Sequence, residues 1–247
     1  MTISGKNAIV TGAGTGIGRG VALELAKRGA SVAVHYNSSE AGAFQTKRLI
    51  DEAGGSCITV KANVASKEEI DRMVETVADR FGRIDILVSN AALQLNLDLF
   101  GHDDDTYDRT MNTNVKGYWQ TIQAVVPHMK SRNHGRIILV SSVHSKRPTD
   151  FDPIYAMSKG AIRMLGRESA IELAGYGITV NMIEPGAIDV GKFRTGSAQS
   201  PELFKKFPGG RVGLPSDVAE LVCYIAGDAT SFMTGTAIRL DGASMLL

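Results

Sequence analysis

The sequence has few cysteines, no excess of either charge and no long apolar run. Cys57 and Cys223 stand far apart with no C-x-x-C spacing, so neither a disulfide framework nor a zinc knuckle is expected. The 27 Lys and Arg residues balance 26 Asp and Glu residues, so no nucleic-acid-binding face is predicted. No apolar stretch approaches the roughly 18 residues that span a bilayer.

The sequence also shows no metal-ligand pattern and no targeting signal. None of the five histidines pairs with another at i, i+4 or at other ligand spacing, so a metal site is not expected. The first expected strand begins within ten residues of Met1, which leaves no room for a signal peptide. Together these observations favour a soluble, cytoplasmic protein. At 247 residues with 43% hydrophobic content, residues 1–247 suit one globular domain.

A short β-branched run, residues 7–11, ends in glycines and is followed by a helical pattern. The glycines fit T-G-x-x-x-G-x-G and not G-x-G-x-x-G. Glycines let the backbone approach a pyrophosphate, and the N-terminus of a helix offers free N–H groups. No G-K-S/T follows, which excludes a P-loop. The sequence therefore predicts a dinucleotide site at Gly12, Gly14, Thr15, Gly16, Ile17 and Gly18.

The second expected strand, residues 31–35, runs into Tyr36, Asn37 and Ser38, with no carboxylate before Glu40. In NAD-binding units an acidic residue near this point binds the ribose 2′-hydroxyl. Its absence removes repulsion against a 2′-phosphate and leaves hydroxyl and amide donors, although no arginine supplies a matching charge. NADP is therefore favoured over NAD.

Strands and helices alternate along the rest of the chain. Near-continuous apolar strands separated by helices predict an α/β fold: one doubly wound Rossmann domain with a parallel seven-stranded sheet covered on both faces. Residues 190–213 have no clear period, and a stretch of this length is interpreted as a substrate lid. The other strands are expected at 57–62, 84–89, 136–140, 178–183 and 237–240, and the helices at 20–29, 41–53, 66–81, 105–130, 155–173 and 216–226.

Capping signals mark two of these helices. Ser66, with Glu69 three residues later, is typical of a capping box. The acidic run 103–105 is interpreted as an N-terminal cap and solvated face. Asn112 and Asn114 lie in the middle of an expected helix, where asparagine is unfavourable. Either one of them has a function, or each bonds a neighbouring backbone group.

Tyr155 is followed four residues later by Lys159, which places both on one face if a helix starts there. Lowering a phenol pKa from ~10 to about 7 requires roughly 4 kcal/mol. One positive charge about 4 Å away supplies roughly that energy at an effective dielectric of about 20. The pair can therefore exchange a proton near neutral pH, although an exposed tyrosine and lysine would have the same spacing.

Five motifs, taken in order, resemble the short-chain dehydrogenase/reductase family over nearly the whole chain. TGAGTGIG at residues 11–18 matches its cofactor loop, and SNAA at 89–92 matches its N-N-A-G strand end. Asn114, Ser142, Tyr155 and Lys159 occupy the family's catalytic positions, and Pro185-Gly186 matches the turn beside the nicotinamide. The resemblance places Asn63, Val64, Asn90, Ala91, Ala92, Tyr155, Lys159, Pro185, Gly186 and Ile188 against the cofactor.

The resemblance also implies a mechanism. A hydride passes between the nicotinamide and a carbonyl or alcohol carbon, with Tyr155 as general acid or base. Lys159 lowers the Tyr155 pKa and holds the ribose, Ser142 hydrogen-bonds the reacting oxygen, and Asn114 anchors a relay water. A homotetramer is the oligomeric state that the resemblance implies.

Three departures from the family pattern concern the cofactor. Ala92 replaces a glycine and narrows the expected nicotinamide pocket. Val190 stands where many members have a threonine that bonds the carboxamide. Asn63 replaces an aspartate near the adenine, so it can accept a hydrogen bond but adds no charge.

The substrate class stays open. SSVHSKRP and PGAI, residues 185–188, resemble bacterial glucose 1-dehydrogenases, whereas VHYNSS resembles 3-oxoacyl-carrier-protein reductases. A sugar is slightly preferred over a ketone. His144 is expected at the substrate mouth or in an exposed loop. Basic residues in or near the lid would bind an acidic partner or form a solvated face: Lys192, Arg194, Lys205, Lys206 and Arg211.

A third hypothesis for the function is a non-catalytic sensor that binds the dinucleotide. A sensor needs no general acid, so the intact catalytic set argues against it.

Overall fold

The computed structural model describes residues 3–191 and 208–246, and it contains one seven-stranded sheet. The strands lie in the order β3-β2-β1-β4-β5-β6-β7, and every neighbouring pair is parallel. This confirms the predicted doubly wound sheet. The strands are β1 (Asn7–Val10), β2 (Ser31–Tyr36), β3 (Ser56–Lys61), β4 (Ile86–Ser89), β5 (Gly135–Val140), β6 (Ile178–Pro185) and β7 (Ala237–Leu240).

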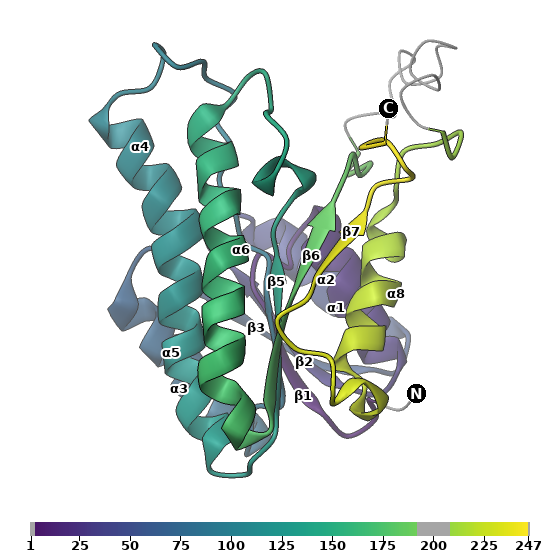
Figure 1. Cartoon of the computed structure of the whole chain (residues 1–247). Helices are drawn as coiled ribbons and strands as arrows, with labels where there is room; N and C mark the ends of the chain where they lie inside the picture. The colour runs from purple at the N-terminus through teal and green to yellow at the C-terminus, as the bar shows by residue number, and fades with distance from the viewer. Residues whose placement is uncertain (1–2, 192–207, 247) are drawn as a thin grey trace.

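Helices cover both faces of the sheet (Figure 1). One face carries α3 (Lys67–Phe81), α5 (Gly117–Lys130) and α6 (Pro153–Leu173), and the other carries α1 (Gly16–Lys27), α2 (Glu40–Glu52) and α8 (Pro215–Ala226). The described chain also contains the helix α4 (Asp104–Met111) and four shorter helical segments: η1 (Asn112–Lys116), η2 (Val143–Ser145), η3 (Ala174–Tyr176) and η5 (Asp228–Thr230).

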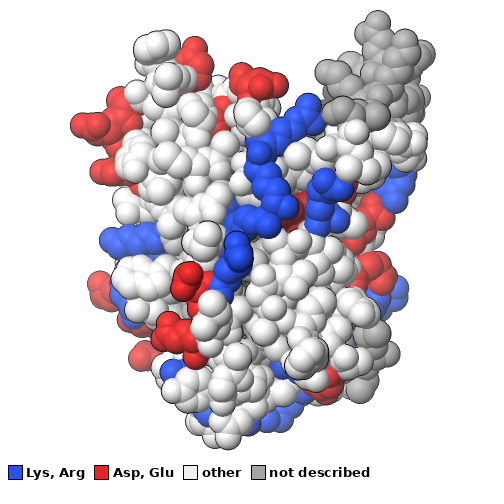
Figure 2. Space-filling model, viewed as in Figure 1, with Lys and Arg blue, Asp and Glu red and all other residues white. Residues whose placement is uncertain are grey.

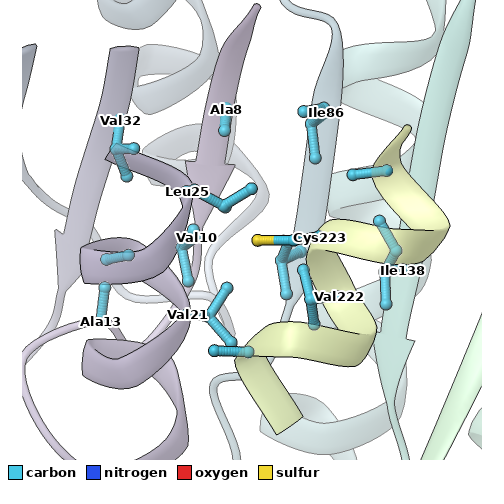
Figure 3. Packing of buried hydrophobic residues seen from close by; sticks show 14 of the residues in the cluster. Ala8, Val10, Ala13, Val21, Leu25, Val32, Ile86, Ile138, Val222 and Cys223 are labelled. Carbon is cyan, nitrogen blue, oxygen red and sulfur yellow. The ribbon is translucent and has the colours of Figure 1, made fainter. Parts of the chain in front are cut away.

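Two apolar cores lie between these layers. Figure 3 shows the core beside α1 and α8, where Val10, Leu25 and Cys223 pack together. On the opposite face, Ile9 and Leu87 pack against α3, α5 and α6. Successive strand residues therefore enter opposite cores, which is why the strands have near-continuous apolar sequences.

The expected helix 105–130 is divided by a π-helix, η1, at Asn112–Lys116. The local sequence indicates helix throughout, but a π-turn inserts one extra residue per turn and such turns are frequent at functional sites. The acidic cap is confirmed, because Asp103 accepts a hydrogen bond from the Thr106 N–H. The capping box at Ser66 is half formed: its hydroxyl accepts from the Glu69 N–H, but the Glu69 carboxylate accepts from the Asn63 N–H instead.

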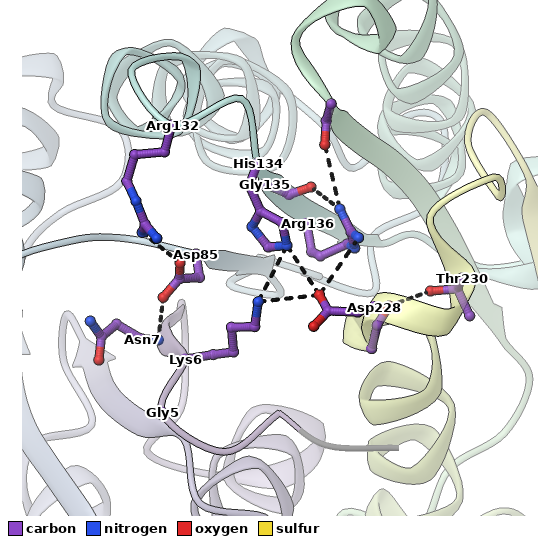
Figure 4. A network of polar contacts seen from close by, with 12 residues as sticks. Gly5, Lys6, Asn7, Asp85, Arg132, His134, Gly135, Arg136, Asp228 and Thr230 are labelled. Atoms are coloured by element: carbon purple, nitrogen blue, oxygen red, sulfur yellow. Dashed lines mark hydrogen bonds and ion pairs between the residues drawn. The ribbon is translucent and has the colours of Figure 1, made fainter.

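Polar contacts tie together the amino ends of the central strands (Figure 4). Asp85 is buried and accepts from the Asn7 N–H and the Arg132 guanidinium, both at 2.9 Å. Asp228 accepts from Lys6 at 3.2 Å. These contacts join β1 and the start of β4 to the segment after α5 and to η5 at the amino ends of the strands, so this edge has a structural role.

Residues 192–207 of the expected lid lie outside the described residues. Lys192, Arg194, Lys205 and Lys206 belong to that segment. Across 3–191 and 208–246, no helix combines the length and apolarity that a membrane crossing requires.

Candidate active site

The glycine-rich turn after β1 is built for close approach of a ligand to the backbone. Gly12 and Gly16 have positive φ angles of 66° and 55°. A Cβ atom at Gly18 would overlap the Gly12 carbonyl oxygen, so glycine is required there. The Thr15 side chain does not cap α1, and the first-turn N–H groups therefore remain able to bind an anion.

The end of β4 is locked to this turn. The Thr11 hydroxyl accepts from the N–H groups of Asn90 at 2.8 Å and Ala91 at 3.0 Å. The Asn90 amide donates to the Thr11 and Gly12 carbonyls. Two segments predicted to bind cofactor, 79 residues apart along the chain, therefore form one surface, which continues to Ala92.

His35 supports the turn from β2, and sequence reasoning did not single it out. The Gly12 N–H donates to its Nδ1 at 3.0 Å, so Nε2 carries the proton and donates to the Ala62 carbonyl at 2.9 Å. Burial lowers the pKa of His35 to about 4, which keeps the ring neutral at pH 7. No motif predicted this contact; the only signal was a histidine inside an apolar strand.

At the expected adenosine end, Asn37 and Ser38 are exposed. The Tyr36 hydroxyl instead donates to Glu40 at 3.2 Å, and its ring is buried against Phe44. Tyr36 therefore already has a partner within the protein.

The Asn63 side-chain oxygen is likewise engaged, because it accepts from the Ala65 N–H at 3.0 Å. Val64, next in the chain, is buried. The hydrogen bond to Ala65 closes the turn that leads from β3 into α3.

Three of the four expected catalytic side chains meet at the carboxyl ends of β5 and β6. Ser142 follows β5, and Tyr155 and Lys159 come from the first turns of α6. The Ser142 hydroxyl lies close enough to the Tyr155 phenol to lower its pKa. The Lys159 ammonium lies 5.4 Å from the centre of the Tyr155 ring and donates to the Val140 carbonyl at 3.0 Å.

The protonation of this group differs from the expectation. Burial raises the pKa of Tyr155, the hydrogen bond with Ser142 lowers it, and the negative charge of Asp152 raises it, so that it is raised overall. Burial also lowers the pKa of Lys159 to about 7. The lysine is therefore only partly charged at neutral pH, and the expected lowering of the Tyr155 pKa is not seen in the protein alone.

Asn114, the fourth expected catalytic residue, forms hydrogen bonds with the backbone of Leu93. Its amide oxygen accepts from the Leu93 N–H at 2.7 Å, and its nitrogen donates to the Leu93 carbonyl at 2.9 Å and to Ser158 at 3.0 Å. Ser158 in turn donates to the Tyr155 carbonyl. Asn114 thus connects the segment after β4 to α6 through Ser158, which sequence reasoning missed.

The turn after β6 approaches the glycine-rich turn. The Gly186 N–H donates to the Leu240 carbonyl at 2.9 Å, and this bond holds the end of β6 beside β7. Ile188 is buried and forms a β-bridge with Gly213. A Cβ atom at Gly16 would lie 3.1 Å from Val190, so this turn borders the predicted cofactor surface.

A cavity of about 250 Å³ lies behind this turn, between Ile188, Arg211 and Asp241. Arg211 forms a two-pronged ion pair with Asp217, at 2.6 and 2.9 Å. Arg211, expected as a basic contact or a solvated face, thus already has an acidic partner.

His144 lies beside Ser142, whose hydroxyl accepts from the His144 N–H at 3.2 Å. The Nδ1 atom of His144 faces the Arg147 and Pro148 carbonyls at 3.1 and 3.2 Å, so Nδ1 carries a proton and Nε2 accepts in the neutral ring. Its ring meets Phe151 edge-on. His144 is therefore half-buried beside Ser142 and is not fully exposed, and its place at the substrate mouth stays a prediction.

Figure 2 shows a band of basic side chains down the face between α6 and β7. Buried Glu184 on β6 pairs with Arg163 at 2.5 Å and with Lys146 at 3.6 Å. Arg239 on β7 pairs with Asp241. Acidic partners therefore offset charges of this region.

Comparison with known proteins agrees with this geometry. The family model described as enoyl-(acyl carrier protein) reductase matches residues 12–243. Glucose 1-dehydrogenase 2 of Bacillus subtilis is 32% identical over 99% of this chain and 96% of its own length. A 3-oxoacyl-(acyl-carrier-protein) reductase, FabG, of Staphylococcus aureus is 34% identical over 96% of this chain and 97% of its own.

Solved structures show the same likeness. A short-chain dehydrogenase/reductase from Serratia marcescens superposes with a TM-score of 0.92, at 31% identity over 99% of both chains. Members of this family use NAD(P) cofactors. This chain belongs to the short-chain dehydrogenase/reductase family and is an oxidoreductase that acts on CH–OH or keto groups.

Proposed function

We propose that this protein transfers a hydride between NADP and a carbonyl or alcohol carbon, with Tyr155 as the proton donor or acceptor. The observation that supports this most directly is the cluster of Ser142, Tyr155 and Lys159 at the carboxyl edge of the sheet. The glycine-rich turn lies at the same edge, where parallel α/β sheets bind ligands.

The residues around that turn fit a dinucleotide. The uncapped start of α1 would receive the pyrophosphate, and Gly12 and Gly18 allow the turn to pack closely against itself and Asn90, which keeps the start of α1 in place. Asn90 and Gly186 border the nicotinamide side. When bound, the nicotinamide supplies the hydride for reduction and accepts it in oxidation.

The chain's own residues handle the proton. In reduction, Tyr155 donates its phenolic proton to the substrate oxygen, and in oxidation the phenolate accepts it. Ser142 donates a hydrogen bond to that oxygen, where negative charge develops. Lys159 holds the ribose, and its proton can replace the one that Tyr155 gives up. A relay water at Asn114 stays a prediction, since the Asn114 amide already bonds Leu93 and Ser158.

NADP is preferred over NAD because no carboxylate ends β2 to bind a ribose 2′-hydroxyl. Asn37 and Ser38 are exposed at that point and can donate to a 2′-phosphate. Tyr36 contributes less than expected, since its hydroxyl is bonded to Glu40.

For the substrate, an aldose is slightly preferred. His144 adjoins Ser142 and leaves Nε2 as an acceptor, which suits a hydroxyl next to the reacting carbon. A 3-oxoacyl or other ketone is the second candidate. It is favoured by Leu95 and Phe151, whose apolar side chains remain partly exposed beside the start of α6.

A substrate panel tests this proposal. Aldoses, polyols and β-ketoesters are assayed with NADP(H) and NAD(H) separately, following absorbance of the reduced nicotinamide. We expect turnover with one substrate class and a higher kcat/KM with NADP(H). Cofactor binding without turnover across the panel would contradict both proposed substrate classes.

We also propose a homotetramer. Trp119 on α5 and Ile171 on α6 are 45% and 77% exposed, and a second copy would cover such apolar side chains. Light scattering after size exclusion measures the mass, and a monomer at micromolar concentration would contradict the proposal.

A further inference from the structure

Asp152 lies at the start of the catalytic helix and is fully buried. It is the N-cap residue of α6, and its Oδ1 atom accepts from the Tyr155 N–H at 2.9 Å. The capping contact therefore fixes the backbone that carries the phenol. Thr149 holds Asp152 in turn, since its hydroxyl accepts from the Asp152 N–H at 2.8 Å.

The second oxygen of Asp152 holds the loop that follows β4. Oδ2 accepts from the N–H groups of Leu95 and Asn96, each at 3.0 Å. Asn96 has a φ of 57°, a left-handed conformation that is unfavourable for a residue with a Cβ atom. With Leu93 bound to Asn114, the loop is tied at two points to the helices that carry the expected catalytic residues.

His102, at the far end of the same loop, completes this arrangement. Its Nε2 lies 3.2 Å from Asp152 Oδ1, and the two side chains are 5% and 1% exposed. A carboxylate only accepts, so Nε2 carries the donated proton. Among the described residues, His102 Nδ1 has no hydrogen-bond partner. Because one ring nitrogen of His102 is left without a partner, the buried His102–Asp152 pair adds little to the free energy of unfolding. Its main effect is to fix the position of the two side chains.

We propose that His102 and Asp152 are positioning residues that hold the loop 93–102 and the Tyr155 backbone as one unit. A substrate carbonyl that contacts the loop then meets the phenol at a fixed distance. This inference rests on the proposed function for its effect on turnover, but the linkage between loop and helix exists without it.

Loss of the His102 contact is expected to reduce kcat more than ligand binding. A misplacement of about 1 Å at a reacting group can slow an enzyme about a hundredfold. His102→Leu removes the donor and keeps an apolar side chain, and we expect kcat to fall between about tenfold and a hundredfold. The Kd for NADPH stays within about twofold, because His102 bonds Asp152 and reaches Tyr155, which is assigned to the cofactor, only through that residue.

The conservative variant separates position from packing. In His102→Gln, the amide nitrogen can donate to Asp152 much as Nε2 does, so kcat should return to within about threefold of the wild type. The matched control is Asp103→Ala, one residue away. Asp103 caps α4 through Thr106 and contacts neither Asp152 nor Tyr155, so its loss should leave kcat unchanged.

The experiment combines hydrogen exchange with kinetics on the full-length protein. Mass spectrometry follows amide exchange in peptides covering residues 93–102 and 150–156, with residues 135–140 of β5 as the internal reference. We expect faster exchange in both peptides of His102→Leu, wild-type exchange in His102→Gln, and a matching loss and recovery of kcat.

Each outcome decides the proposal. Faster exchange in the loop peptide alone, or unchanged exchange in both, would overturn it, as would wild-type kcat despite faster exchange in both. If the wild type turns over no substrate, the proposed function fails. The exchange data then decide by themselves whether His102 links the loop to Tyr155.

Discussion

Replacing Lys159 with methionine is expected to stabilise the fold. The unfolded chain holds the lysine proton with the ordinary pKa of 10.5, and the folded chain with a pKa of about 7, because the amine is buried. At 1.36 kcal/mol per pH unit, burying the charged amine costs about 5 kcal/mol at neutral pH. The hydrogen bond to the Val140 carbonyl offsets about 1–3 kcal/mol of that.

Lys159→Met should therefore raise the free energy of unfolding by about 2–4 kcal/mol at pH 7. The Val140 carbonyl keeps a partner in this variant, because the Tyr118 hydroxyl also donates to it at 3.1 Å. The variant should be inactive, since it lacks the ammonium assigned to the ribose and the proton path.

The pH dependence gives the sharper test. The pKa of Lys159 is lower in the folded chain than in the unfolded chain, so the unfolded chain binds more protons between pH 7 and 10.5. The contribution of Lys159 to the wild-type free energy of unfolding therefore rises with pH in that window. Methionine binds no proton. The stability difference between the two proteins should therefore shrink by about 3 kcal/mol between pH 7 and 9.5, and stay constant below pH 7.

Urea unfolding without nucleotide, at equal protein concentration from pH 6 to 9.5, measures this difference. The matched control is Lys27→Met, whose side chain is 73% exposed on α1 and should show little pH-dependent change. A Lys159→Met protein less stable than the wild type at pH 7, or a difference that does not shrink at alkaline pH, would refute the reasoning.

Two further predictions concern the glycine-rich turn. His35 titrates normally when unfolded but has a folded pKa of about 4, so stability present above pH 6.5 should fall by about 3 kcal/mol as the pH drops to 4. The asparagine in His35→Asn cannot be protonated, so the free energy of unfolding measured in urea should fall less between pH 7 and pH 4.5 in this variant than in the wild type. Equal decreases in the two proteins would contradict this. Gly18→Ala should weaken NADPH binding at least about tenfold by calorimetry, because the methyl group overlaps the Gly12 carbonyl. Gly175→Ala, where nothing lies within 4 Å, is the control; equal affinities in both variants would count against the turn as the binding site.

The sheet and the glycine-rich turn were predictable because their signals are local. Strands such as β4 and β5 are apolar at nearly every position, since both faces of a parallel sheet are buried. Gly12 and Gly18 stand at fixed positions in a strand-turn-helix segment. The cap at Asp103 is likewise local, since donor and acceptor lie three residues apart.

The supporting contacts were not predictable because their partners are distant in sequence. His102 and Asp152 are 50 residues apart, and no pattern in either segment indicates the other. The two asparagines at residues 112–116 were a signal of something unusual, but nothing in the sequence indicated that it would be a π-helix. The protonation of Lys159 depends on its burial, whereas the sequence alone treats it as a full positive charge.

Single-turnover reduction tests the central assignment, Tyr155 as the general acid, most directly. Enzyme with bound NADPH is mixed with a carbonyl substrate from the panel, and the reduced-nicotinamide absorbance is followed. We expect Tyr155→Phe to slow its loss by about a hundredfold to ten-thousandfold, with NADPH affinity retained and Tyr176→Phe unaffected. A Tyr155→Phe protein that oxidises NADPH at the wild-type rate would contradict the assignment.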